Sequence, residues 1–291
     1  MVKTIKSTRD LISFIDKTVL ITGASSGIGR AIALRFAEAG ARLMLLDIDD
    51  DGLVETTNLC KKYCDKCSTF SIDLSEKSKV DEFWNEIIKA DLPDILVNNA
   101  GIYPMMDYLK VDEKFLNKTL DVNLNSTFWM CQNFISKRLK RGGIIVNMSS
   151  IEAILPFKKD MVHYSISKAG VIALTRSLAR DYGKLGFRSN VVMPGAILTS
   201  GTEALMKNAI LGLKMSLIKT GYDFKQRLAN NKWGQPDDVA KVVLFLSSDL
   251  ASYMQGAVVP VDGGFLSSKF NKPVTCNART GLLSGGLLYL G

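Results

Sequence analysis

The chain has 291 residues, of which 47% are hydrophobic, and its 37 basic and 29 acidic side chains give a net charge of +8. That length supports one large hydrophobic core or two small ones. The basic residues are scattered and have no interleaved aromatic residues, which argues against nucleic-acid binding. No apolar stretch approaches the ~18 residues of a membrane span, and the N-terminus lacks an uninterrupted apolar segment, so we expect a cytoplasmic protein without membrane partners.

The small, odd number of five cysteines indicates reduced thiols in a cytosolic chain. Cys60, Cys64 and Cys67 have a C-x3-C-x2-C spacing that some iron–sulfur enzymes use. The alternative is a buried helical stripe, because Leu53, Thr57, Cys60 and Cys64 recur at helical spacing. No fourth ligand lies nearby, so we expect no metal site.

In chain order, residues 1–15 form a polar, partly helical extension, and a single domain follows over 16–266. The β-branched run Thr18–Thr22 indicates a buried strand, which leads into the glycine-rich stretch Gly23–Gly29 and a helix ending near Gly40. Glycines permit close backbone approach, and a helix N-terminus presents free N–H groups, so this context predicts a phosphate site. The G-x3-G-x-G spacing, in place of G-x-G-x2-G, indicates one branch of dinucleotide-binding proteins. The alternative is a glycine turn that binds no ligand.

The next strand, residues 42–46, ends at Asp47, where the acid that binds the cofactor ribose is expected ~20 residues after the glycines. Asp47 can accept hydrogen bonds from both ribose hydroxyls of NAD, and it would repel the 2′-phosphate of NADP. Residues 49–51 are also aspartates and add to the negative electrostatic field around Asp47. Arg30 and Lys61 or Lys62 are candidates for compensating that charge, but we expect NAD rather than NADP.

Helices and strands continue to alternate to the end of the domain. Strands are expected over 68–72, 94–97, 143–148, 189–193 and 257–261, and helices over 51–64, 75–90, 111–140 and 160–184, with a last one opening at 233–238. This alternation predicts a parallel sheet with helices on both faces. Residues 200–232 are apolar and rich in Met and Leu, which fits a core segment and a mobile lid over an apolar substrate equally well. Residues 267–291 read as a loosely ordered tail.

Tyr164 and Lys168 lie four residues apart on one predicted helix, so their side chains share a face. A cation within ~4–6 Å favours the phenolate and lowers a tyrosine pKa that is otherwise near ~10. The pair is therefore a candidate general acid/base. A solvated helix face is the alternative for this spacing alone. The polar residues that follow successive strands favour the catalytic interpretation, because ligands bind at the carboxyl ends of strands in open α/β sheets.

In this order and spacing the motifs resemble those of the short-chain dehydrogenase/reductase family. The resemblance runs from about Asp16 to Phe265 and rests on TGASSGIG, Asp73-Leu74, NNAG, Asn123, Ser150, YSISK, PGAILT and VDGG. It implies an α/β fold, a three-layer Rossmann-type doubly wound parallel sheet of about seven strands. It also implies an NAD(P)-dependent oxidoreductase that interconverts a secondary alcohol and a ketone, and a homotetramer.

The resemblance assigns roles to four residues. Tyr164 would exchange the proton with the carbonyl oxygen, and Ser150 would hydrogen-bond the same oxygen. Lys168 would lower the tyrosine pKa and hold the nicotinamide ribose, and Asn123 would hold a water that links Lys168 to solvent. The implied cofactor contacts are Gly23, Ser25, Ser26, Gly27, Ile28, Gly29, Asp47, Ile48, Asp73, Leu74, Asn99, Ala100, Gly101, Tyr164, Lys168, Pro194, Gly195, Ile197 and Thr199.

One departure stands out. The spacing from Ser150 to Tyr164 is one residue longer than is commonest in the family, which makes Ser149 a rival for the serine role. The glycine loop also contains a G-x-S-x-G pattern around Ser25, as in hydrolases. A hydrolase needs a histidine base, and the single histidine, His163, is expected in the pocket wall or at the surface.

Two further functions remain as alternatives. One is a 3-oxoacyl-carrier-protein reductase that uses NADPH, for which the +8 charge would attract an acidic carrier; Asp47 argues against it. The other is a dinucleotide-binding scaffold without catalysis, since fold alone does not define function. A scaffold has no need of the complete set of Asn123, Ser150, Tyr164 and Lys168.

Overall fold

The computed structural model describes residues 5–64, 66–87, 92–199 and 225–268. Within these residues, seven parallel strands form one sheet with the order β3-β2-β1-β4-β5-β6-β7, which confirms the predicted fold class. The strands are β1 (Thr18–Thr22), β2 (Arg42–Asp47), β3 (Cys67–Ser71), β4 (Ile95–Asn98), β5 (Gly143–Met148), β6 (Phe187–Pro194) and β7 (Val258–Val261). The order changes direction between β1 and β4, which places a ligand crevice at the carboxyl ends of those strands.

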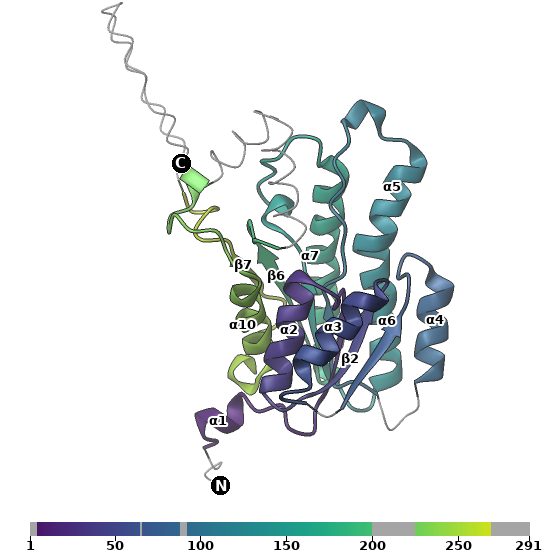
Figure 1. Ribbon diagram of the computed structural model, residues 1–291, viewed down its shortest axis with the longest axis vertical. Coiled ribbons are helices and arrows are strands. Elements are labelled where there is room, and N and C mark those ends of the chain that lie inside the picture. Colours follow the sequence, from purple (N-terminus) through teal and green to yellow (C-terminus); the bar gives the residue numbers. More distant parts are fainter. Residues whose placement is uncertain (1–4, 65, 88–91, 200–224, 269–291) are drawn as a thin grey trace, which may run out of the picture.

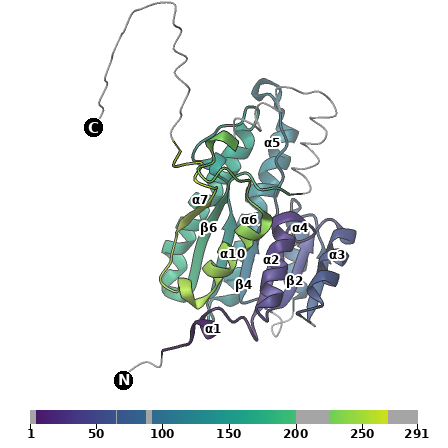
Figure 2. The same cartoon turned by 60° about the vertical axis from the view of Figure 1, so that its left-hand side comes forward.

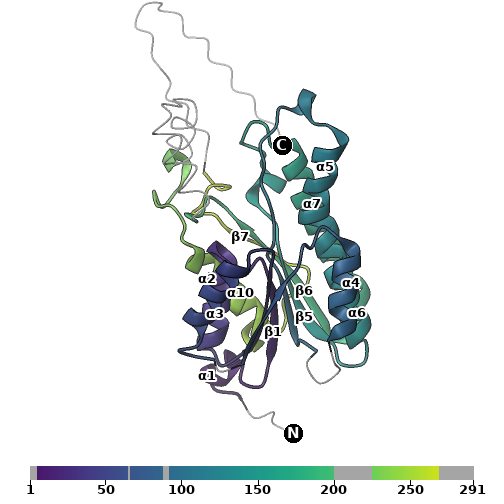
Figure 3. The same ribbon diagram turned by 45° about the vertical axis from the view of Figure 1, so that its right-hand side comes forward.

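Helices cover both faces of the sheet (Figures 1 and 3). One face carries α2 (Gly27–Glu38), α3 (Asp50–Cys60) and α10 (Pro236–Ser247), and the other carries α4 (Lys77–Glu86), α6 (Ser126–Arg138) and α7 (Val162–Tyr182). Shorter elements are α1 (Thr8–Leu11), α5 (Glu113–Leu120), η2 (Tyr108–Lys110), η3 (Asp121–Asn125), η4 (Ile151–Ala153), η5 (Gly183–Leu185) and η6 (Asp249–Ala251). Figure 2 shows α5 extending beyond the sheet, above the ends of the central strands.

The strands are apolar on both sides because both faces of the sheet are covered. Val19, Leu20 and Ile21 are fully buried, with Val19 and Ile21 packing toward α2 and Leu20 toward the opposite face. The continuous β-branched and aliphatic runs that predicted buried strands follow from this arrangement. Phe14, from the N-terminal extension, packs edge-on against Phe36 of α2, with ring centres 4.9 Å apart.

The prediction of one continuous helix over 111–140 is wrong, and the interruption matters for the site. The chain forms α5, then a π-helical turn, η3, and then α6. A π turn inserts one extra residue into a helix and is frequent at functional sites. Here it carries Asn123, which is fully buried. The helix predicted over 75–90 also ends early, at Glu86, because Ile87 adopts an extended conformation.

Burial of Cys60 and Cys64 agrees with the core interpretation, but the predicted helical stripe over Cys64 is wrong, because α3 ends at Cys60. Cys60 and Cys64 are buried in the core beneath α3, and the Cys64 thiol donates to the carbonyl oxygen of Ala41 at 3.1 Å. Burial raises the pKa of Cys60 to about 12. Among the described residues, no group of three or more His, Cys, Asp or Glu side chains is arranged to hold a metal ion. No helix in the same part of the chain is long and apolar enough to cross a membrane.

Two predictions concern residues that the structure does not describe. The first is the Met- and Leu-rich segment, for which a core role and a lid were equally favoured; its residues 200–224 are outside the described ranges. The second is the loosely ordered tail, of which residues 269–291 are outside them. The domain boundaries at 15/16 and 266/267 stay predictions.

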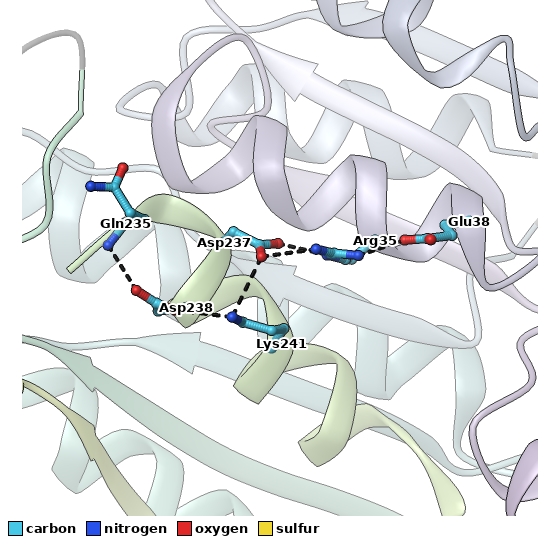
Figure 4. Close-up of polar contacts among 6 residues, drawn as sticks. All are labelled: Arg35, Glu38, Gln235, Asp237, Asp238 and Lys241. Carbon is cyan, nitrogen blue, oxygen red and sulfur yellow. Dashed lines mark hydrogen bonds and ion pairs between the residues drawn. The ribbon is translucent and has the colours of Figure 1, made fainter.

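An ion-pair network joins α2 to α10, which pack against each other on one face of the sheet (Figure 4). Arg35 of α2 donates to both carboxylate oxygens of Asp237 at 2.6 and 2.8 Å. Lys241 lies 3.5 Å from the same carboxylate and 3.0 Å from Asp238. The hydrogen bond from Arg35 holds the pKa of Asp237 below its usual value.

Replacing Asp237 with asparagine should therefore lower the free energy of unfolding at pH 7 by about 0.5–1 kcal/mol, a value discounted because both side chains are partly exposed. Because the folded pKa is lowered, this stabilisation is present above the unfolded pKa of ~4 and is lost as the pH falls through the folded value. Urea unfolding of both proteins at pH 7 and pH 3 measures it. Asp181→Asn is the control, because among the described residues Asp181 pairs with its chain neighbour Arg180 alone; equal losses in the two variants would contradict the cross-helix assignment.

Candidate active site

A cavity of about 700 Å³ opens at the carboxyl ends of the parallel strands. Its walls are the residues that follow β1, β2, β3, β4, β5 and β6, together with the start of α7. Of the residues that the sequence assigned to catalysis or to the cofactor, all line this cavity except Gly29 and Asn123, which lie directly behind its wall. The structure therefore brings together residues that are spread from 23 to 199 in the chain.

The glycine loop has the geometry of an anion cradle. Gly23 has a φ of +65°, which favours glycine. A Cβ on Gly29 would lie 1.9 Å from the carbonyl oxygen of Gly23, so the first turn of α2 packs directly on the loop. Ser26 precedes α2 and, among the described residues, its side chain makes no capping hydrogen bond. The first N–H groups of α2 thus face the cavity region and fit the pyrophosphate of a dinucleotide.

Thr22 and Asn99 hold this loop in place. Thr22 Oγ1 accepts hydrogen bonds from the backbone N–H groups of Asn99 and Ala100, each at 3.0 Å. The Asn99 amide donates to the carbonyl oxygens of Thr22 at 3.1 Å and Gly23 at 3.0 Å. Asn99 was predicted as a ribose contact, and the structure gives its side chain a positioning role. Thr22 escaped the sequence analysis because a threonine at the end of a strand carries no distinctive signal.

Asp47 is positioned by the loop that it faces. Its Oδ2 accepts from the backbone N–H of Ser25 at 2.9 Å, and its Oδ1 accepts from Ile48 and Asp49 at 2.8 and 3.1 Å. These bonds keep the carboxylate at the edge of the cavity, where Ile48 is also exposed.

The three basic residues considered as compensation for that negative charge have other partners. Arg30 forms an ion pair with Glu55 at 2.7 Å and donates to the carbonyl oxygen of Ser25. Lys61 donates to Asn58, and the ammonium of Lys62 lies over the ring of Tyr63. The three candidates for compensation are therefore engaged elsewhere, and none of these contacts is made with Asp47.

Asp73 and Leu74 form the wall beyond Asp47. The Asp73 carboxylate accepts from the backbone and hydroxyl of Ser75 at 2.9 and 2.7 Å, and it lies 3.1 Å from the ammonium of Lys118. Burial alone would raise the pKa of Asp73, but the bonds from Ser75 and Lys118 outweigh it and lower that pKa. Lys118 comes from α5 and was missed, because its partner is distant in sequence.

Ser150, Tyr164 and Lys168 meet at the inner end of the cavity. Ser150 follows β5, and Tyr164 and Lys168 come from the first two turns of α7. The ammonium of Lys168 lies 5.9 Å from the centre of the Tyr164 ring and donates to the carbonyl oxygen of Met148 at 3.1 Å. Ser149 is not a rival for the serine role, because its hydroxyl donates to the carbonyl oxygen of Lys168 at 2.7 Å.

The predicted electrostatics of the tyrosine need correction. Burial is the main cause that raises the pKa of Tyr164 to about 12; the hydrogen bond with Ser150 acts to lower it, and the charges of Glu152 and Tyr103 act with burial to raise it. Burial also lowers the pKa of Lys168 to about 8. Desolvation disfavours the charged form of both groups, so it outweighs the attraction that their spacing suggested.

Asn123 clamps the loop that follows β4. Its Oδ1 accepts from the backbone N–H of Ile102, and its amide donates to the carbonyl oxygen of Ile102, both at 2.8 Å. A Cβ on Gly101 would lie 3.2 Å from Asn123 Oδ1 and 3.3 Å from the ammonium of Lys168. The asparagine thus lies next to the lysine, as expected, but its side chain fixes backbone, and the predicted water contact stays a prediction.

His163 lies behind the site rather than in its wall or at the surface, which corrects the prediction. The ring is 2% exposed and packs edge-on against Phe115. Its Nε2 donates to the carbonyl oxygen of Pro104 at 2.7 Å, since a carbonyl can only accept. The histidine therefore holds the 102–106 segment over the cavity and does not activate Ser25, which removes the basis for a hydrolase.

Comparisons with known proteins agree with this geometry. A family model described as enoyl-(acyl carrier protein) reductase matches residues 23–266. The 3-oxoacyl-[acyl-carrier-protein] reductase of Thermotoga maritima is 34% identical over 86% of this chain and 98% of its own length. The 2-dehydro-3-deoxy-D-gluconate 5-dehydrogenase of Bacillus subtilis is 33% identical over 89% and 98% of the two chains.

The structure is also similar to solved ones. A protein from Agrobacterium tumefaciens, assigned as a 2-deoxy-D-gluconate 3-dehydrogenase and solved with bound NADP, superimposes with a TM-score of 0.80 at 32% identity, over 89% of this chain and 99% of its own. With the sheet order and the cavity residues, these matches define the protein class: the chain belongs to the short-chain dehydrogenase/reductase family. It is an oxidoreductase of that type, for which a nicotinamide dinucleotide is the expected cofactor.

Proposed function

We propose that this oxidoreductase interconverts a secondary alcohol and a ketone with NAD(H), and that Tyr164 exchanges the proton. One observation carries the proposal: Ser150, Tyr164 and Lys168 converge in the same cavity as the glycine loop and Asp47. A scaffold that only bound a dinucleotide would need the loop and Asp47 but not the buried tyrosine and lysine. The dinucleotide, when bound, supplies or accepts the hydride.

The side chains supply the proton and the stabilisation of charge. Negative charge develops on the carbonyl oxygen during reduction, and Tyr164 Oη and Ser150 Oγ are the donors directed at it. Each such donor in a site that excludes water is worth roughly 2.7–4 kcal/mol of transition-state stabilisation. Lys168, whose ammonium lies beside the tyrosine ring, is positioned to favour the phenolate left after proton transfer.

The choice of NAD over NADP is supported by the acidic ribose end. The Asp47 carboxylate would lie against a 2′-phosphate, and the guanidinium of Arg30, a candidate for compensating that charge, is already paired with Glu55. The A. tumefaciens relative was solved with bound NADP, so membership of the family does not by itself decide the cofactor. The preference therefore depends on residues at this edge of the cavity.

Asp47→Asn should narrow the preference for NADH over NADPH by about tenfold or more. The substitution removes a negative charge that would repel the 2′-phosphate of NADPH. The asparagine keeps an acceptor oxygen for the backbone N–H groups of Ile48 and Asp49. The ratio of kcat/KM for the two cofactors measures this. An exposed acid outside the cavity, as in Glu113→Gln, serves as the control. An unchanged ratio in Asp47→Asn would mean that another group selects the cofactor.

The reaction class is tested by following absorbance at 340 nm with a panel of secondary alcohols and ketones and both cofactors. We expect turnover with NAD(H) and a homotetramer by light scattering. A protein that binds NADH but reduces no ketone and oxidises no alcohol would contradict the proposal. The panel includes an acetoacetyl-carrier protein with NADPH, because the carrier-protein reductase of T. maritima and the net charge of +8 favour that substrate as the second candidate.

A further inference from the structure

The segment after Ser150 folds back over the cavity because a buried carboxylate holds it. Glu152 is 3% exposed. Its Oε1 accepts from the backbone N–H of Lys158 at 3.1 Å, and its Oε2 accepts from that of Phe157 at 3.3 Å. The hydroxyl of Ser165, on α7, donates to the same Oε2 at 3.5 Å. Both carboxylate oxygens of Glu152 thus accept hydrogen bonds that fix the segment after Ser150, and Phe157 and Lys158 of this segment line the cavity.

Lys158 is the unmatched cation of this cavity. Two other lysines line it, and both have partners: Lys118 binds Asp73, and Lys168 donates to Met148. Within the described part of the chain, the ammonium of Lys158 makes no hydrogen bond and no ion pair, although the residue is partly buried. Burial lowers the pKa of Lys158, and the charge of Glu152 raises it. A partly desolvated ammonium without a partner is costly, so an anion in the cavity would be bound favourably.

The position of Lys158 shows which ligand this anion belongs to. Glu152 accepts hydrogen bonds from the backbone of Lys158 and from the hydroxyl of Ser165, which adjoins Tyr164 on α7, so the lysine lies near the catalytic end of the cavity. Apolar side chains of Met105, Phe157 and Met161 line the cavity beside it. A ligand at this end therefore meets apolar side chains, the ammonium of Lys158, the tyrosine and the Glu152 carboxylate, whose oxygens already accept from backbone N–H groups.

We propose that Lys158 binds a carboxylate of the substrate, so that the enzyme acts on hydroxy acids and the corresponding keto acids. This rests on the proposed function, because it places the reacting carbon at Tyr164. The apolar walls hold the carbon skeleton, the ammonium of Lys158 pairs with the carboxylate, and Glu152 is the positioning residue that directs the lysine inward.

The test compares acids with neutral amides of the same shape. The probes are 3-hydroxybutanoate and 3-hydroxycyclohexanecarboxylate, each with its primary amide, assayed with NAD on the full-length wild type, Lys158→Gln and Lys159→Gln. Lys159 is the matched control, because it is the exposed neighbour and does not line the cavity. A charged hydrogen bond predicts that the wild type favours the acid by roughly tenfold to a hundredfold in kcat/KM, mainly through KM. Lys158→Gln should lose this preference, Lys158→Arg should retain most of it, and Lys159→Gln should behave as the wild type.

Other results separate failure of this inference from failure of the proposed function. If the wild type oxidises cyclohexanol but shows no preference for acids, or if Lys158→Gln keeps the preference, the carboxylate site is wrong and the reaction class stands. If no alcohol is oxidised with either cofactor, the proposed function fails, and thermal unfolding decides the site. Cyclohexanecarboxylate, but not its amide, should then raise Tm in the wild type and in Lys159→Gln, and neither compound should raise it in Lys158→Gln. Equal Tm shifts for the acid and the amide would overturn the proposed carboxylate site at Lys158.

Discussion

Replacing Gly29 with alanine should weaken NADH binding by at least about a hundredfold and lower Tm. The added Cβ would lie 1.9 Å from the carbonyl oxygen of Gly23 and 2.7 Å from the amide of Asn99. Backbone cannot yield as a flexible side chain does, so the loop and the first turn of α2 must separate. Overpacking of this kind costs typically ~1–3 kcal/mol, and displacement of the N–H groups removes the anion cradle as well. Fluorescence titration with NADH measures the affinity.

Gly170→Ala is a matched control for this variant. Gly170 is also a helical glycine, but a Cβ there would meet only the side-chain end of Leu124, at 2.8 Å. We expect its NADH affinity to stay within about twofold of the wild type, since a flexible side chain can move aside. A Gly29→Ala protein that binds NADH as the wild type does would show that the loop does not form the cofactor site.

The fold could be predicted from sequence because local signals and tertiary structure agree. β1 and β5 begin and end where the apolar runs do, since both strands are buried on each face and are bounded by polar or glycine residues. The cavity residues could be predicted for a related reason: polar residues that follow successive parallel strands must meet at one edge. Helix ends were less accurate, and the π turn at Asn123 was missed because it has no distinctive composition.

The electrostatics and the supporting contacts could not be predicted. The tyrosine pKa depends on how deeply Tyr164 is buried, and spacing along a helix shows only which side chains are neighbours. The hydrogen bonds of Thr22, Lys118 and Glu152 join residues whose partners follow from the three-dimensional fold. His163 was misplaced for the same reason, because the 102–106 segment that covers it is some 60 residues away in the chain.

Tyr164→Phe should abolish NADH-linked ketone reduction while it leaves NADH binding nearly unchanged. Tyr164 lines the cavity with Ser150, and in the proposed mechanism its phenol hydroxyl supplies the proton; phenylalanine keeps the ring but has no proton to give. Loss of a positioned general acid typically reduces the rate by roughly a hundredfold to ten-thousandfold. Because the ring still fills its place beside Lys168, the cofactor site should keep its shape.

Ser149→Ala is the control for this variant. The Ser149 hydroxyl binds backbone of α7, so its loss should cost stability but leave the catalytic hydroxyls in place. A rate for Ser149→Ala as low as that of Tyr164→Phe would place the proton donor elsewhere.

The most direct measurement determines the dissociation constant for NADH and kcat for ketone reduction on the same preparations of the wild type and Tyr164→Phe. We predict equal dissociation constants and a kcat lower by at least about a hundredfold in the variant. A Tyr164→Phe protein that reduces ketones at the wild-type rate would contradict the assignment of Tyr164 as the proton donor.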